Sequence, residues 1–288
     1  MSQKNDDGKR SARARMLEER AKQDAKARKV RQLSAIGVAL AVIVVAVVIG
    51  ILIQSNRSSS YDAAKDAPAG AVGTNNLVIP VGASNAPSTL TVYEDPRCPA
   101  CESFETTMKS TINQLLSQGK IQVHYHIVSF IDRHDGGKGS KNGANALACA
   151  QNAGHFHNYH DVLYANQPQE TDDAWADKSV LIGLAKQVPG LDTPTFESCV
   201  NNNSFGNWVT AVQADFDKSG FTSTPTVLLN GTPAYPTYNN EQISPANLVK
   251  WVDAANKGKQ PASIPAASAQ ALASPTAHNN PAPSPTGS

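Results

Sequence analysis

Two cysteines stand two residues apart in the segment YEDPRCPAC, at positions 98 and 101. A CxxC pair of this kind can hold zinc, form a structural bridge or exchange disulfides with other proteins. Structural zinc needs four ligands, usually two such pairs or one pair and two histidines, and the chain has a single CxxC. A permanent bridge across so short a loop would constrain the unfolded chain little. Thiol–disulfide exchange is therefore the favoured chemistry.

The residues around the pair predict unequal roles for the two sulfurs. Leu90–Tyr93 alternates apolar and polar residues, which is typical of a strand, and the residues after Cys101 carry an apolar face at helical spacing. Cys98 therefore opens a helix, where unpaired backbone N–H groups and the positive end of the dipole stabilise a thiolate. Cys101 lies one turn deeper and is expected to be a sheltered thiol.

The other two cysteines, Cys149 and Cys199, are 50 residues apart, each in a segment with a helical pattern. A bridge between them would close a long loop and stabilise the fold by ~3–4 kcal/mol in the chain-entropy model. We expect a structural disulfide here. A resolving or relay role for this pair is the alternative.

The first 53 residues predict a membrane anchor. Residues 1–33 hold eleven basic and five acidic side chains, and residues 34–53 contain no charge. About twenty apolar residues suffice to cross a bilayer as a helix, and the basic flank places the N-terminus in the cytoplasm. A cleaved signal peptide is the alternative, but the apolar run is long for one. The basic tail could bind nucleic acid, although a solvated tail beside anionic lipid is favoured, and we expect no nucleic-acid partner.

The rest of the chain divides by composition. Residues 54–74 are polar and small and predict a linker, whereas residues 257–288 are rich in Pro, Ala and Ser and predict a disordered tail. Residues 75–256 remain as one folded domain in an oxidising compartment, where disulfides persist. Within it, residues 141–219 have the pattern of a helical insertion.

The elements of this domain are expected in the order strand, helix, strand, several helices, strand, strand and helix. Residues 76–81 predict an edge strand interrupted by Pro80, and residues 121–127 predict another strand. Thr171 is expected to cap one helix of the insertion. Residues 226–229 predict a strand that turns at Asn230-Gly231, and a final helix follows Ser244.

CPAC between a strand and a helix, followed by TPTVLLNG at residues 224–231, resembles the thioredoxin fold and in detail its DsbA-like branch. The resemblance runs from about residue 76 to 256 and implies an α/β fold with a helical insertion. It implies that Pro225 is a cis proline against the cysteines and that Thr224 offers backbone groups to substrate. Pro99 and Ala100 would complete the active-site motif. The order of basic tail, apolar run, linker and folded domain in this chain resembles that of membrane-anchored members of this branch.

The resemblance implies an enzyme that introduces disulfides into reduced exported polypeptides. A membrane quinone-linked thiol oxidase would restore the disulfide of this enzyme. The enzyme itself is expected to need no cofactor. Isomerase or reductase activity, or a non-enzymatic binding or chaperone module, are the alternatives. Relatives carry a buried acid six residues before the first cysteine, where this chain has Val92, and strong oxidants carry a histidine where it has Ala100. The nearest acids are Glu94 and Asp95, and Glu94 could serve in its place through a water.

The cluster HFHNYH at residues 155–160 invites comparison with a metal site. At most two of its three histidines, His155, His157 and His160, would share a helix face. We therefore expect no metal site.

Overall fold

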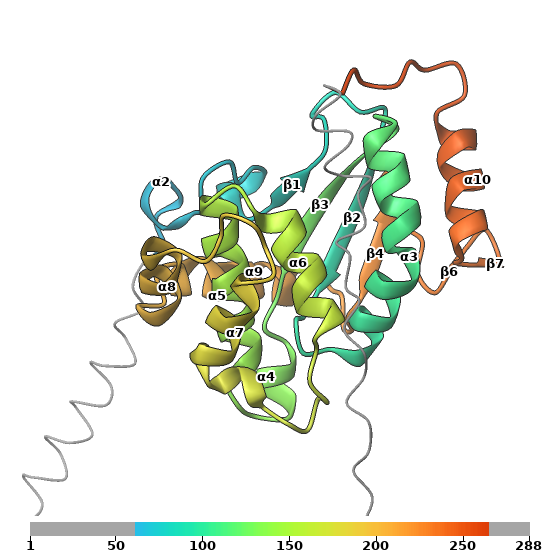
Figure 1. Ribbon diagram of the computed structural model, residues 1–288. Helices are drawn as coiled ribbons and strands as arrows, with labels where there is room; N and C mark the ends of the chain where they lie inside the picture. Colours follow the sequence, from blue (N-terminus) through green and yellow to red (C-terminus); the bar gives the residue numbers. More distant parts are fainter. Residues whose placement is uncertain (1–60, 265–288) are drawn as a thin grey trace, which may run out of the picture. The chain divides into compact units, whose positions relative to one another are not determined.

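The computed structural model describes residues 61–264, which form a mixed β-sheet with helices packed around it (Figure 1). Within these residues no helix is both long enough and apolar enough to cross a membrane. The predicted basic tail at residues 1–33 and the predicted anchor at residues 34–53 lie outside the described part of the chain.

The main sheet has five strands in the order β1-β3-β2-β4-β5, so the strand that leads to Cys98 is central. β2 runs parallel to β3 and antiparallel to β4, while β1 and β5 pair antiparallel at the edges. The strands are β1 (Ile79–Val81), β2 (Ser88–Glu94), β3 (Ile121–Ile127), β4 (Thr226–Leu229) and β5 (Thr232–Pro233). The predicted strands and the turn after β4 are confirmed.

Alternation along β2 assigns its side chains to two helical layers, because successive residues of a strand point to opposite faces. Glu94 is buried on the face covered by α3 (Pro99–Ser117), where it interacts with Glu105. Tyr93 points to the other face and contacts Phe216 of α9 (Gly206–Lys218), with ring centroids 5.8 Å apart. Each face of the central strand is therefore covered by a helix.

The final helix, α10 (Pro245–Ala255), packs beside α3. Ser244 caps it by accepting a hydrogen bond from the backbone N–H of Asn247, and Pro245 occupies its first turn, as predicted. A short hairpin of β6 (Thr237–Tyr238) and β7 (Glu241–Gln242) leads into it.

The helical insertion supplies helices to both faces of the sheet, because its helix at Phe156–Ala165 packs beside α3 whereas α9 covers the opposite face. The disulfide Cys149–Cys199 joins α5 to α8 with a Cα–Cα distance of 6.0 Å, which confirms the predicted pairing. The helical insertion begins at Ile131 and not at the predicted residue 141, because α4 and the first turn of α5 precede that residue. Besides α9, it contains α4 (Ile131–His134), α5 (Gly139–Asn152), α6 (Phe156–Ala165), η2 (Ala174–Ala176), α7 (Lys178–Ala185) and α8 (Pro194–Asn201).

The predicted helix start at Thr171 is wrong. The helix begins at Lys178, and Asp177 caps it by accepting a hydrogen bond from the backbone N–H of Ser179. Asp173 instead turns toward the start of α5, where its carboxylate accepts hydrogen bonds from the backbone N–H groups of Lys138 and Gly139. Residues 171–173 are therefore held outside a helix by this tertiary contact.

Two predicted boundaries also need correction, because chain assigned to the linker and to the tail packs on the domain. Residues 61–74 include α2 (Ala63–Asp66), and the Gln151 amide donates a 2.8 Å hydrogen bond to the carbonyl of Ala69. Beyond residue 256, Ala262 is buried, and its N–H donates to the carbonyl of Gly119 at 2.9 Å. The remaining linker and tail residues lie outside the described range.

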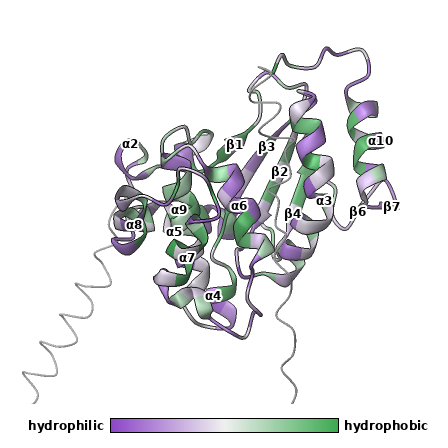
Figure 2. Ribbon diagram, in the orientation of Figure 1, coloured by the Kyte–Doolittle hydropathy of each residue, from purple (hydrophilic) through white to green (hydrophobic). Residues whose placement is uncertain are grey.

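Buried apolar residues of the strands and of the surrounding helices form one core cluster. Figure 2 shows hydrophobic residues along the strands and on parts of the helices around them. A second, smaller cluster contains both active-site cysteines together with Ile131 and Tyr164, with Phe130 packed against it. The CxxC pair is therefore built into packed structure and not carried on a free loop.

Candidate active site

Cys98 and Cys101 lie at the junction of β2 and α3, as the sequence predicts. Cys98 is the N-cap residue of α3, with extended backbone angles, and Pro99 follows at the first helical position. Both cysteines are free thiols. Cys98 is 5% exposed, whereas Cys101 is completely buried. The geometry therefore separates an outer and an inner sulfur.

The two thiols differ in acidity because the inner one stabilises the outer one. A hydrogen bond from the Cys101 thiol is the largest cause that lowers the pKa of Cys98 to about 6. Burial opposes this effect, while hydrogen bonds from the Thr224 side chain and from the backbone N–H groups of Ala100 and Cys101 add to it. Burial holds the pKa of Cys101 well above its ordinary value, and the neighbouring Cys98 raises it further. Cys98 is thus the thiolate and Cys101 the protonated thiol.

The predicted Thr224–Pro225 wall lies against the outer sulfur. The peptide bond between these residues is cis, as the resemblance implies. The Sγ atom of Cys98 lies 3.4 Å from the carbonyl oxygen of Thr224, to which the thiol can donate. Since β4 begins at the next residue and pairs with β2, the sheet brings together residues 126 positions apart in sequence.

The loop before Cys98 is fixed by Arg97, whose side chain is 3% exposed. Its guanidinium forms ion pairs with Asp132 at 2.8 Å and Asp173 at 3.2 Å. It also donates hydrogen bonds to the carbonyls of Gly136 and Glu170. Arg97 therefore ties the residue beside the reactive cysteine to two loops of the helical insertion.

Asp95 stabilises the same loop from inside. Its carboxylate accepts hydrogen bonds from the backbone N–H groups of Arg97 and Ile131 and from the Ser140 hydroxyl, all at 2.7–2.8 Å. Burial nevertheless dominates and raises the pKa of Asp95 to about 7. The active-site loop thus contains a carboxyl group that titrates near neutrality.

Two further side chains come from the end of α6 and the residues after it. The Tyr164 hydroxyl donates to the carbonyl of Asp95 at 3.3 Å. The Gln167 amide donates to the carbonyls of Pro96 and Cys98 at 2.6 and 3.2 Å. Sequence reasoning missed Arg97, Tyr164 and Gln167, because no motif or periodicity distinguishes them from other polar residues.

Position 92 is apolar and buried, but an acid lies two residues later on the same strand face. Glu94 is fully buried, and its carboxylate lies 2.6 Å from Nε2 of His160. Sequence reasoning did not identify His160 as a direct partner of Glu94. Among residues 61–264, one group of at least three possible metal-ligating side chains converges, and it consists of Glu94, Glu105 and His160. His155 and His157 are not part of it.

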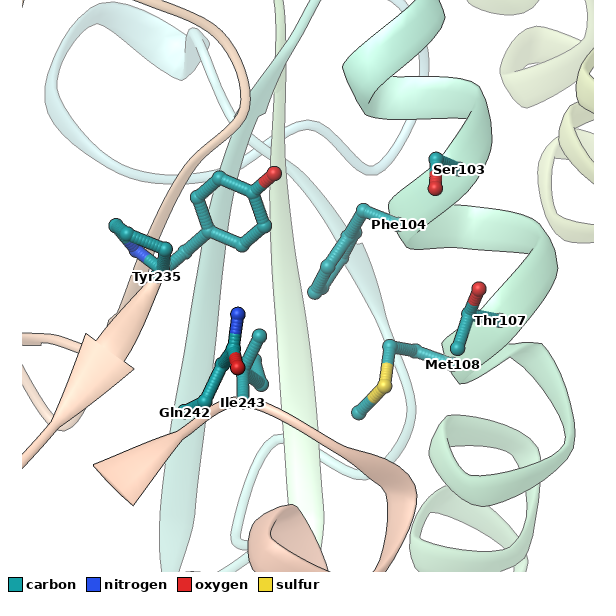
Figure 3. Close-up of a pocket in the computed structure, with 8 residues that line it drawn as sticks. Ser103, Phe104, Thr107, Met108, Tyr235, Gln242 and Ile243 are labelled. Atoms are coloured by element: carbon teal, nitrogen blue, oxygen red, sulfur yellow. The ribbon is translucent and has the colours of Figure 1, made fainter.

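A pocket of about 210 Å³ lies along α3, beginning two residues after Cys101 (Figure 3). Phe104 and Tyr235 face each other across it, with ring centroids 6.0 Å apart and nearly perpendicular planes. The pocket is lined by Ser103, Phe104, Thr107, Met108, Tyr235, Pro236, Gln242 and Ile243. It offers a recess lined by both apolar and polar side chains close to the start of the active-site helix.

Comparison with known proteins agrees with this architecture. The family model described as Thioredoxin matches residues 74–254. A probable disulfide bond formation protein D of Bacillus cereus is 25% identical over 164 residues, which cover 56% of this chain and 73% of that protein.

Solved structures show the same relationship. Oxidised DsbA of Mycobacterium tuberculosis superimposes with a TM-score of 0.54 at 25% identity and covers 68% of this chain and 97% of its own. Oxidised BdbD of Bacillus subtilis gives a TM-score of 0.53 at 21% identity, covering 67% and 100%, which supports the fold. With a CxxC pair at the strand–helix junction, a cis proline beside it and a family match over more than half its length, the chain belongs to the thioredoxin family as a DsbA-like thiol–disulfide oxidoreductase.

Proposed function

We propose that the protein introduces disulfides into reduced exported polypeptides through Cys98 and Cys101. The observation that carries this direction is the lowered pKa of Cys98, about 6, caused first by the hydrogen bond from Cys101. A stable thiolate is a good leaving group, so stabilising it makes the corresponding disulfide a stronger oxidant. The names of the relatives, which are disulfide bond formation proteins and DsbA, support the same direction.

The reaction begins from the Cys98–Cys101 disulfide. A substrate thiolate attacks Sγ of Cys98, a substrate–Cys98 disulfide forms, and the electron pair of the broken bond passes to Cys101. A second substrate thiolate then attacks the substrate sulfur, and Cys98 departs as a thiolate. The substrate is oxidised by two electrons and the enzyme pair is reduced by two.

Two features of the site suit an extended polypeptide. The carbonyl of Thr224 lies beside Cys98 and can accept a backbone N–H of a substrate strand. The pocket along α3, with Phe104 and Tyr235 in its wall, can receive an apolar side chain of the same polypeptide. A substrate would thus be held next to the reactive sulfur by one polar and one apolar contact.

A membrane setting is part of this proposal. The uncharged run at residues 34–53 and the basic residues before it support an anchor with the active site on the extracytoplasmic side. A membrane quinone-linked thiol oxidase would regenerate the disulfide there. The disulfide Cys149–Cys199 suits an oxidising compartment.

The test uses the full chain in detergent with a reduced, multi-disulfide substrate protein. We expect wild type to restore substrate activity and Cys98→Ser to abolish this, because the attacked sulfur is missing. The reduction potential of the pair then gives the direction: about −120 mV suits an oxidase, whereas about −270 mV suits a reductase. Unchanged refolding by Cys98→Ser would instead favour a non-enzymatic binding or chaperone role. A potential near the reductase value would overturn the oxidising direction.

A further inference from the structure

The carboxylate of Asp95 lies inside the turn that leads to the reactive cysteine. Asp95 follows the last residue of β2 and is completely buried. The backbone N–H of Cys98 donates to the Asp95 carbonyl at 3.0 Å, which closes residues 95–98 into a hydrogen-bonded turn. Within this turn, Oδ1 of Asp95 accepts the backbone N–H of Arg97 at 2.8 Å. The Asp95 side chain therefore fixes the residue that precedes Cys98.

The same carboxylate joins the turn to two elements of the helical insertion. Oδ2 of Asp95 accepts the backbone N–H of Ile131, the first residue of α4, at 2.8 Å. Oδ1 also accepts the hydroxyl of Ser140 on α5 at 2.7 Å. The Ile131 side chain belongs to the small apolar cluster that contains both active-site cysteines. Asp95 thus holds the backbone of the catalytic turn and, through α4, one of the side chains packed against its sulfurs.

These contacts require a carboxylate and not simply a polar side chain. The N–H groups of Arg97 and Ile131 are backbone donors that cannot reverse their role, and they approach different oxygens of Asp95. An amide in this place would turn its NH2 group toward one of these donors and leave that N–H without an acceptor. A buried donor without an acceptor is costly, so the turn would shift to relieve it.

The turn decides where the Cys98 sulfur lies between the sheet and the active-site helix. On the side of the sheet, Sγ of Cys98 lies 3.4 Å from the carbonyl oxygen of Thr224. On the side of the helix, the Cys101 thiol and backbone N–H groups in the first turn of α3 stabilise its thiolate. Hydrogen bonds weaken steeply as their geometry worsens. A turn that can shift would therefore stabilise the thiolate less.

The titratable groups that face Asp95 are Asp132 on α4, Tyr164 on α6, and Cys98 and Cys101 at the start of α3. The charge of Asp132 adds to burial in raising the pKa of Asp95 to about 7, and the Arg97 guanidinium is paired with Asp132. Burial holds the pKa values of Tyr164 and Cys101 well above their ordinary range, so both stay neutral near pH 7. Ionised Asp95 and the Cys98 thiolate are therefore the two charges that influence each other across this turn.

We propose that Asp95 is a positioning residue for the exchange reaction, and that its carboxylate holds residues 95–98 so that Cys98 keeps the contacts that stabilise its thiolate. This inference rests on the proposed thiol–disulfide exchange. Asp95 touches neither substrate nor a reacting sulfur and exchanges no proton with either cysteine. It acts when Cys98 departs from the mixed disulfide, because the held turn then keeps the leaving thiolate beside the start of α3.

The first test is the reduction potential of the full chain in detergent, measured against glutathione at pH 8, where Asp95 is ionised. In Asp95→Asn we expect the Cys98 thiolate to be about tenfold less stabilised, which lowers the potential by about 30 mV. The charge of Asp95 acting alone predicts the opposite sign, since removal of a negative charge stabilises a nearby thiolate. An unchanged or raised potential would overturn the proposal.

Asp177→Asn is the matched control for this measurement. Like Asp95, Asp177 accepts the backbone N–H of the residue two positions later, here Ser179 at 2.9 Å, but it caps α7. This variant should keep the wild-type potential. Urea denaturation gives the stability of both variants. A loss of stability in Asp95→Asn without a change in potential would assign a merely structural role to Asp95.

The second test uses the wild-type chain and stands even if Asp95→Asn does not fold. Alkylation rates measured across the pH range give the steepness of the Cys98 titration. If ionised Asp95 favours the thiolate through position, the two groups lose their protons together, and the rate rises over a narrower pH range than for one independent group. Asp95→Asn should then show the slope of a single group and a higher half-point. A wild-type curve broadened by repulsion between the two charges would contradict the positioning role.

These measurements separate the two proposals. If wild-type Cys98 titrates as an ordinary thiol and the potential lies near the reductase value, the proposed oxidising function fails. If the wild-type chain is oxidising and Asp95→Asn keeps the same potential, only the positioning role of Asp95 fails.

Discussion

The reactivity of Cys98 arises from groups that surround a single sulfur atom. Its position at the N-cap of α3 supplies backbone N–H groups, and the fold adds a side-chain hydrogen bond from Thr224. The strongest contribution comes from Cys101, whose own thiol is kept protonated by burial. The hydrogen bond between the two sulfurs therefore lowers the pKa of Cys98 and raises that of Cys101.

This predicts how Cys98 titrates. In the reduced protein, alkylation of Cys98 by iodoacetamide should show a half-point near the pKa of about 6. In Cys101→Ala, the half-point should move up toward the ordinary value of 9.0, because the main hydrogen-bond donor is gone. Rates measured across the pH range give both values. A half-point that stays near 6 in this variant would show that the helix start alone stabilises the thiolate.

The same shift has a consequence for stability with a definite sign. The pKa of Cys98 is depressed from 9.0 to about 6, so its contribution is present above pH 9 and lost as pH falls through 6. The oxidised protein lacks this titration. As the pH rises from 6 to 9, the free energy of unfolding of the reduced form should therefore increase relative to that of the oxidised form.

At the scale of elements, the start of α3 is positioned by the helical insertion as much as by the sheet. Arg97 contacts the loop before α5 and the loop after α6, and it pairs with Asp132, whose side chain is 2% exposed. Gln167 and Tyr164 hold the carbonyls of the same turn from α6. The insertion therefore acts as a brace for the catalytic turn.

Removing this brace should be costly. Arg97→Met leaves Asp132 as a buried carboxylate without its cation, so we expect a loss of about 3–5 kcal/mol in the free energy of unfolding. Arg133→Met is the matched control, because the Arg133–Asp217 pair is exposed and such pairs contribute at most about 1 kcal/mol. Urea denaturation of both variants measures the difference. Equal losses would show that Arg97 does not brace the turn.

At the scale of the whole molecule, the folded unit is longer than its composition suggests. Tyr61 donates a 2.6 Å hydrogen bond to the carbonyl of Asn75, and α2 contacts α9. Beyond α10, the N–H of Ala262 donates a hydrogen bond to the carbonyl of Gly119, a residue with a positive φ of 64°. Both ends of the described chain thus pack on the domain: Tyr61 and Ala67 are partly buried against the core, and Ala262 is buried.

This predicts a difference between two fragments. Residues 61–264 should fold cooperatively, whereas residues 75–256 should be less stable by about 2–4 kcal/mol, because several hydrogen bonds and buried apolar contacts are missing. Chemical denaturation followed by tryptophan fluorescence compares the two. Equal stability would mean that the flanking segments only lie on the surface. Both fragments keep the cysteines, so their thiol reactivity serves as an internal check of folding.

Short-range sequence patterns predict much of this protein's secondary structure. Strand alternation before Cys98, helical spacing after Cys101 and the turn residues Asn230-Gly231 each act over a few positions, and the structure has those elements. The cis bond before Pro225 and the Cys149–Cys199 bridge were also predicted, the first from resemblance and the second from the number and placement of cysteines.

Only the tertiary structure decides what converges on these elements. Glu94 and His160 are 66 residues apart, and Arg97 and Asp132 are 35 apart, so no local spacing links them. Burial then changes their chemistry, since Asp95 and Glu105 acquire raised pKa values through desolvation, which only the packed fold creates. The sequence by itself determined the reactive pair and its strand–helix frame, because those depend on short-range geometry. The charge around the inner sulfur depends on which distant residues share its burial, and that was settled only by the fold.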